Sequence, residues 1–116
     1  MRFMMIYRSV ERDAPPSEKE MADMGAFIEE LAKSGTLLLT DGLMPSATGA
    51  RVRLDRGKVT VTDGPFTEAK EVIGGFAIVN MNSKEDAVAL AKRFLVIAGD
   101  GESEIRQMYD APAFAA

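Results

Sequence analysis

The acid/base groups of this chain are restricted to carboxylates, lysines and tyrosines, because its 116 residues include neither histidine nor cysteine. These absences exclude disulfides, zinc–thiolate sites and cysteine nucleophiles, together with every Ser-His-Asp or Cys-His arrangement. Apart from Tyr7 and Asp41, the remaining candidates lie in residues 62–75, which read Thr-Asp-Gly-Pro-Phe-Thr-Glu-Ala-Lys-Glu-Val-Ile-Gly-Gly. Any chemistry of this chain is therefore expected near that segment.

Two residues are candidates for catalysis. Asp63 ends a predicted strand beside Phe66, where we expect partial burial, a condition that favours acid/base work by a carboxyl group. The structural alternative is that Asp63 caps the turn before Pro65. Tyr7 is the second candidate, and it shares its strand face with apolar residues, so core packing is the alternative for it.

The candidate ligand-binding residues surround these two in the predicted fold. They are Asp41, Phe66, Glu68, Lys70, Glu71, Gly74 and Gly75. Lys70 and Glu71 form either a ligand-facing pair or a salt bridge at the surface. The glycine pair predicts a bulge or the close approach of another backbone, so we expect Gly75→Val to be the most disruptive substitution of the segment.

We expect no cofactor and no structural metal. The methionines invite a soft-metal interpretation, but most fall on predicted core stripes, which favours packing. Those on such stripes are Met4, Met5, Met21, Met24, Met81 and Met108. Acidic clusters such as Glu29-Glu30 lack the spacing of a calcium loop.

Hydrophobic patterning predicts the element order β-α-β, hairpin, β-α-β. The expected strands are 2–8, 36–40, 72–81 and 103–109, the helices are 17–34 and 83–99, a half-buried hairpin pairs 51–55 with 58–62, and 111–116 form a tail. The first and third strands are apolar at both odd and even positions, which is typical of central strands. The predicted fold class is α+β, a ferredoxin-like split βαβ with an inserted β-hairpin and an antiparallel sheet covered by two helices on one face.

Length, charge and hydropathy narrow the class of protein. The mass of 12.6 kDa predicts one domain over residues 1–116. A net charge of −4 opposes direct binding to nucleic acid, and the basic cluster of residues 51–58 is typical of a solvated face. No apolar run has the length of a membrane span or a signal-peptide core, so we expect a cytoplasmic protein without membrane contact.

The predicted sheet has apolar residues on both faces and helices for only one of them. An uncovered apolar face of that size is unusual on a monomer, so we expect a homodimer whose sheets pack face to face. The space between the two sheets is then the expected ligand site.

Residues 62–75 closely resemble the DGPF-motif branch of the YCII-related family. The shared pattern also includes the Met-rich first strand with Tyr7, the Asp41-Gly42-Leu43 turn and Thr48-Gly49. The resemblance implies a bacterial protein with a ferredoxin-like fold in the dimeric α/β-barrel superfamily, and most members have no assigned function. One member is a dehydrochlorinase of chlorinated hydroxyaromatic compounds with a proposed His and Asp acid/base pair. Because this chain has no histidine, that chemistry is not carried over.

Two functional hypotheses follow. The first is a homodimer that binds a small aromatic or carbonyl-containing molecule between its sheets, with carboxylate-based acid/base catalysis left open. The second is a non-enzymatic accessory module that binds a protein partner such as an extracytoplasmic-function sigma factor, since the resemblance includes proteins encoded beside such factors.

Overall fold

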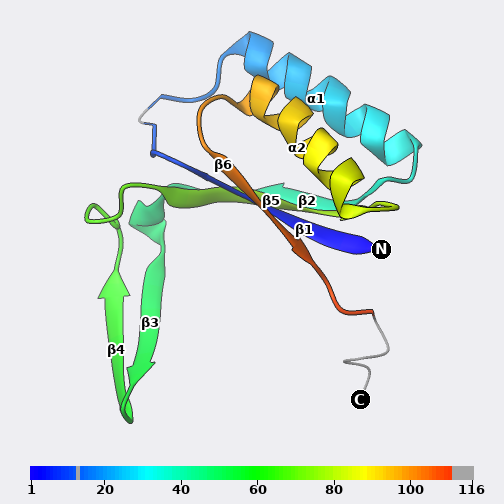
Figure 1. The fold of residues 1–116 in the computed structure, drawn as a ribbon. Helices are drawn as coiled ribbons and strands as arrows, with labels where there is room; N and C mark the ends of the chain where they lie inside the picture. The colour runs from blue at the N-terminus through cyan, green and yellow to red at the C-terminus, as the bar shows by residue number, and fades with distance from the viewer. Residues whose placement is uncertain (13, 111–116) are drawn as a thin grey trace.

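A computed structural model describes residues 1–12 and 14–110, so the expected tail 111–116 lies outside the described residues. The elements are β1 (Arg2–Ser9), α1 (Glu18–Lys33), β2 (Leu37–Gly42), the 3-10 turn η1 (Ser46–Thr48), β3 (Ala50–Asp55), β4 (Lys58–Asp63), β5 (Val72–Asn80), α2 (Lys84–Ala98) and β6 (Glu102–Gln107). Four strands form an antiparallel sheet in the order β2-β5-β1-β6, with both helices on one face (Figure 1). This is the strand order of a split βαβ arrangement. The predicted α+β class and the two central strands are confirmed.

Strand alternation places the core on the helix-covered face. Phe3 of β1 lies opposite Val79 of β5, and both are almost fully buried. The cluster is completed by Met5, Phe27, Leu31, Ala87, Leu90 and Ala91. The intervening residues point to the other face, where Met4 pairs with Ile78 and Ile6 with Phe76. We call these four residues, together with Leu39 of β2 opposite Ile78, the open face. Both helices lie on the other side of the sheet (Figure 1).

The glycine pair of β5 lies at a β-bulge, as its sequence predicts. Tyr7 pairs with Gly75 and Arg8 pairs with Ile73, so Gly74 has no opposite residue. A Cβ on Gly75 would lie 3.0 Å from the carbonyl oxygen of Asp41, which shows the close backbone approach. The prediction that the second strand ends at residue 40 is wrong. Asp41 and Gly42 continue the strand, because both pair with β5 where the two backbones lie close together.

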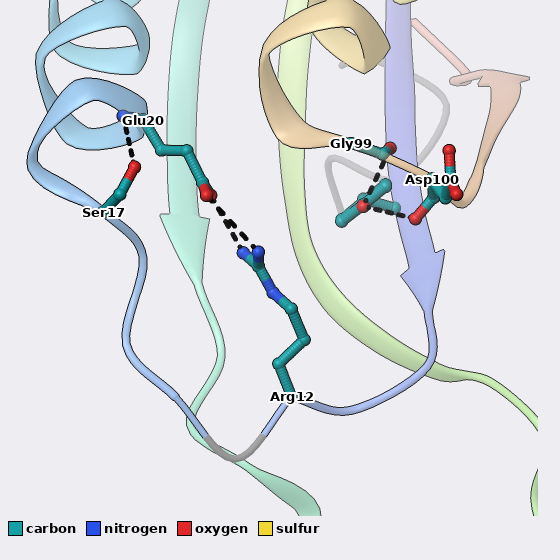
Figure 2. Close-up of polar contacts among 6 residues, drawn as sticks. Arg12, Ser17, Glu20, Gly99 and Asp100 are labelled. Atoms are coloured by element: carbon teal, nitrogen blue, oxygen red, sulfur yellow. Dashed lines mark hydrogen bonds and ion pairs between the residues drawn. The ribbon is translucent and has the colours of Figure 1, made fainter.

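Serine caps begin both helices, as predicted. The Ser17 hydroxyl accepts from the backbone N–H of Glu20 at 3.1 Å, and Ser83 caps α2 in the same way. The carboxylate of Glu20 also forms an ion pair with the guanidinium of Arg12, at 3.1 Å between Oε2 and Nη2. This pair connects the loop after β1 to the first turn of α1 (Figure 2). In the part of the chain that is described, neither helix combines the length and hydropathy needed to cross a bilayer.

The β3–β4 hairpin, here called the arm (Ala50–Asp63), extends from the sheet on the side opposite the helices (Figure 1). Its turn residues Arg56 and Gly57 have φ values of 51° and 82°, the two positive angles of a type I′ hairpin turn. The predicted hairpin is confirmed, but its predicted half-burial is wrong. Every residue of both strands is exposed, because the arm leaves the sheet and none of the described helices and strands packs against either of its faces.

The base of the arm is fixed by residues of the Asp-Gly-Pro-Phe segment packed on η1. Ser46 is buried, its hydroxyl accepts from the N–H of Phe66 at 3.0 Å, and its own N–H donates to the Glu11 carboxylate at 2.6 Å. Gly64 donates to the carbonyl of Gly49 at 2.9 Å. A Cβ on Gly64 would overlap the Ser46 carbonyl group. Gly64 is therefore the glycine of the segment with the least room for a side chain, and a substitution there is now expected to be more disruptive than one at Gly75.

Gly64→Ala is expected to lower the free energy of unfolding by several kcal/mol, because the added methyl group meets backbone that cannot rotate away. Gly25→Ala is the matched control, since a Cβ there meets open space and alanine favours a helix by about 1 kcal/mol over glycine. Urea unfolding of both variants measures the difference. Equal stability of the two variants would contradict the packing described for Gly64.

Acid unfolding tests the Arg12–Glu20 pair. The pKa of Glu20 lies below its ordinary value of 4.5, first because Arg12 donates a hydrogen bond to it and also because of the positive charge of Arg12. A depressed folded-state pKa contributes stability above pH 4.5 that is lost as the pH falls through the folded value. Glu20→Gln is therefore expected to have a lower melting temperature than the wild type at pH 7 and to approach it in acid. A difference that stays constant with pH would be inconsistent with this pair.

Candidate functional site

A cavity of about 580 Å³ lies between the helices and the covered face of the sheet. Its wall is mainly apolar and comes from both helices and from all four strands of the sheet. The apolar lining includes Met5, Met24, Phe27, Leu31, Val79, Leu90, Phe94 and Ile97. Small-molecule sites are typically concave and mostly apolar, with volumes of about 300–1,000 Å³. The cavity therefore has the size and character of a binding site for a small organic molecule.

Tyr7 lies on the cavity wall with its ring against Phe94, edge to face, at 5.2 Å between ring centroids. Its hydroxyl is 3.0 Å from the carbonyl oxygen of Asp100 and 3.3 Å from that of Gly99. Carbonyl oxygens only accept hydrogen bonds, so the single phenolic proton is directed to the α2–β6 loop. Tyr7 can offer the cavity a lone pair, while its proton is engaged elsewhere.

Ser103 of β6 is the cross-strand neighbour of Tyr7 and also lines the cavity. Its hydroxyl oxygen is buried and has no hydrogen-bond partner among the described residues. A buried hydroxyl without a partner costs free energy, and most such groups in proteins are satisfied. The Ser103 hydroxyl is therefore a polar group available to a molecule in the cavity.

Charged groups stand at the cavity rim. Arg12 and Glu20, whose ion pair is drawn in Figure 2, both line it. Asp41 lines it from the edge strand β2. The first turn of α1 lies over this opening, which explains why Met21 is 61% exposed. The prediction that Met21 belongs to the core stripe is wrong, because at that turn the helix faces the cavity opening instead of the packed sheet.

The structure divides the predicted site residues into two groups. Tyr7, Asp41, Gly74 and Gly75 all line the cavity. The other five, Asp63, Phe66, Glu68, Lys70 and Glu71, lie outside it, at and after the base of the arm. The two groups do not form one site in the single chain.

The residues at the base of the arm interact mainly with each other. The Arg51 guanidinium lies over the ring of Phe66, with its Cζ atom 3.8 Å from the ring centroid. It also forms an ion pair with the Glu68 carboxylate, at 2.5 Å between Nη1 and Oε1. Asp63 is exposed, so the partial burial expected for it is wrong, because the strand that it ends belongs to the projecting arm. Lys70 and Glu71 are exposed as well.

Sequence reasoning missed Arg12, Glu20 and Ser103 as site residues. The spacing from Ser17 identifies Glu20 as a helix-capping residue, which it is, but gives no sign that its carboxylate stands at a cavity. Ser103 is an ordinary strand residue in the sequence, and only its pairing with Tyr7 brings it to the site. Among residues 1–12 and 14–110, no three acidic side chains gather in a way that could hold a metal ion.

Comparison with known proteins gives the family. The family model described as "YCII-related domain" matches residues 1–110. An uncharacterised protein of Rhizobium meliloti (strain 1021) is 32% identical over 75 residues, which are 65% of this chain and 60% of that protein. The chain thus covers less than two thirds of the length of this relative. Because the family model extends over nearly all of the sequence, the chain belongs to the YCII-related family.

Proposed function

We propose that this chain binds a small, largely apolar molecule in the cavity between the two helices and the sheet. The observation that supports this function is the cavity itself, whose volume of about 580 Å³ fits an aromatic compound of one or two rings. The location differs from the predicted space between two sheets, which lies against the opposite face and needs a second chain.

The polar groups of the cavity favour a carbonyl or carboxyl group on this molecule. The Ser103 hydroxyl is a donor without a partner, and a carbonyl oxygen is the acceptor that would satisfy it. Tyr7 beside it offers an acceptor for a ligand N–H or O–H group, since its own proton is directed to the α2–β6 loop. We therefore expect an aromatic molecule with one oxygen-bearing end, oriented toward β6.

Binding is better supported than proton transfer. The phenolic proton of Tyr7 is engaged with backbone carbonyls, and Arg12 keeps the pKa of Glu20 below its ordinary value, which makes this carboxylate a weak base. Efficient acid/base groups have pKa values near the working pH. We therefore propose a binding protein first, with catalysis as an open extension.

A homodimer of the DGPF branch is the second part of the proposal. Four apolar residues of the two central strands lie on the open face, and a second copy of the chain is the simplest cover for them. Such a dimer would have the face-to-face sheets of a dimeric α/β barrel. A regulatory partner such as a sigma factor remains a second candidate.

A thermal-shift screen of aromatic acids, phenols and enol lactones tests the ligand site. A ligand at 100 times its Kd is expected to add about 2.7 kcal/mol to the free energy of unfolding. Ser103→Ala is expected to raise the stability of the free protein by about 1 kcal/mol, because it removes a buried hydroxyl without a partner, and to weaken the ligand effect.

Ser46→Ala is the matched control for this serine. It removes an acceptor that the N–H of Phe66 uses, so the free protein is expected to lose about 1 kcal/mol while the ligand effect remains. The absence of any stabilising ligand in the screen would argue against the proposed function. A loss of stability in Ser103→Ala equal to that in Ser46→Ala would show that Ser103 has a structural role.

Asp63→Asn distinguishes the cavity from the Asp-Gly-Pro-Phe segment as the ligand site. Because Asp63 is exposed and lies outside the cavity, the variant is expected to keep the ligand-induced shift and its melting temperature within error. The measurement is the same thermal shift with the best ligand of the screen. A tenfold loss of affinity at unchanged stability would instead assign the site to the segment containing Asp63.

A further inference from the structure

The arm carries an apolar strip on one of its faces. Val52 pairs with Val61 and Leu54 pairs with Val59, so these four side chains, here called the strip, share one face of the hairpin. Their exposed fractions lie between 61% and 70%. The opposite face is polar and pairs Arg51 with Thr62. An alternating hairpin of this kind normally has its apolar face covered, and among residues 1–12 and 14–110 none covers this one.

The exposed area of the whole chain is larger than that of a compact monomer of the same mass. The chain exposes 8576 Å², whereas a compact monomer of its mass exposes roughly 6,200 Å². The excess of roughly 2,400 Å² exceeds the roughly 800 Å² that each partner contributes to an interface of standard size. The chain therefore has enough uncovered surface for a stable interface.

Charge favours a second copy of this chain as the cover. Four cations, Arg51, Arg53, Arg56 and Lys58, stand against two anions, Asp55 and Asp63, so the arm has a net charge of +2. Because the whole chain has a net charge of −4, the remainder carries −6. Two arms of like charge repel each other, as do two bodies, whereas the basic arm of one copy and the acidic body of another attract each other.

The arm is held in position for such a contact. Ser46 connects the Glu11 carboxylate to the N–H of Phe66, and Gly64 is hydrogen-bonded to Gly49. These contacts join the arm to η1 and to the loop after β1, so the arm is anchored by more than its two covalent connections. An anchored arm pays less conformational entropy on association than a free one.

We infer that the strip of each arm docks at the β2 edge of the open face of a second copy of the chain, beside the two packed sheets, so that the two arms clasp the dimer. This inference rests on the homodimer of the proposed function and adds the arm to its interface. In this arrangement the Asp-Gly-Pro-Phe segment positions the arm for association. Apolar side chains meet apolar side chains, and the net positive charge of the arm favours its approach to the acidic body of the partner.

Sedimentation equilibrium at micromolar concentration is the first test. The wild type is expected to have twice the mass of the 12.6 kDa chain. A variant with Val52, Leu54, Val59 and Val61 all replaced by threonine keeps good strand formers and is expected to raise the dimer dissociation constant at least tenfold. The control is the double variant Thr60→Ser and Thr62→Ser on the polar face of the same hairpin, which is expected to leave the dimer dissociation constant unchanged.

The outcomes of this test separate the two proposals. A monomeric wild type overturns both the homodimer and the docking of the arm. A wild-type dimer whose dissociation constant is the same in the threonine variant supports the homodimer and overturns the role of the arm. Circular dichroism of the threonine variant at low concentration verifies that the body remains folded.

Cross-linking locates the contact, since the natural chain has no cysteine. Chains with Leu54→Cys are mixed with chains carrying Leu39→Cys, a position at the edge of the open face, under mild oxidation. The reference mixture replaces the second variant by Val96→Cys, which is 86% exposed on α2 on the other side of the sheet. We expect mixed disulfides at least tenfold faster than in the reference, and equal rates would overturn the proposed docking site.

Discussion

The pairing of β1 with β5 is the constraint on which the rest of the structure depends. Both strands are apolar on both faces, and a chain of this topology has two helices, which can cover one face only. Phe3 and Val79 are buried on the covered side, while Ile6 and Phe76 remain on the open face. The cavity, the arm and the inferred association all follow from how these two faces are used.

The two faces have different consequences for function. On the covered side α1 and α2 do not fill the space near the bulge of β5, so a cavity remains beside Gly74 and Gly75, where small residues leave room. On the open side the chain supplies apolar surface and an anchored arm. The proposed ligand binding and the inferred association therefore use opposite faces of one sheet. A mutation on one face changes one of these two properties without altering the residues that serve the other.

The Asp-Gly-Pro-Phe segment illustrates how residue type can suggest chemistry where the structure assigns packing. Its carboxylate, Asp63, is exposed, whereas Gly64 and Phe66 make the close contacts with η1. Gly64 has no room for a methyl group, and Phe66 packs at the base of the hairpin. These packing roles account for the residue types of the segment without assigning it a catalytic role. The polar groups near a cavity are instead Tyr7 and Ser103, on neighbouring strands.

The sequence by itself determined the order of elements, the serine caps, the central strands and the glycine bulge, because each depends on local patterns of polarity and backbone freedom. It also indicated Tyr7 and Asp41 as residues near a site. Only the tertiary structure decided that Glu20 and Ser103 meet at one cavity and that the arm leaves the sheet. The reason is physical: periodicity reports which face of an element is apolar, whereas the packing of distant segments decides what covers that face.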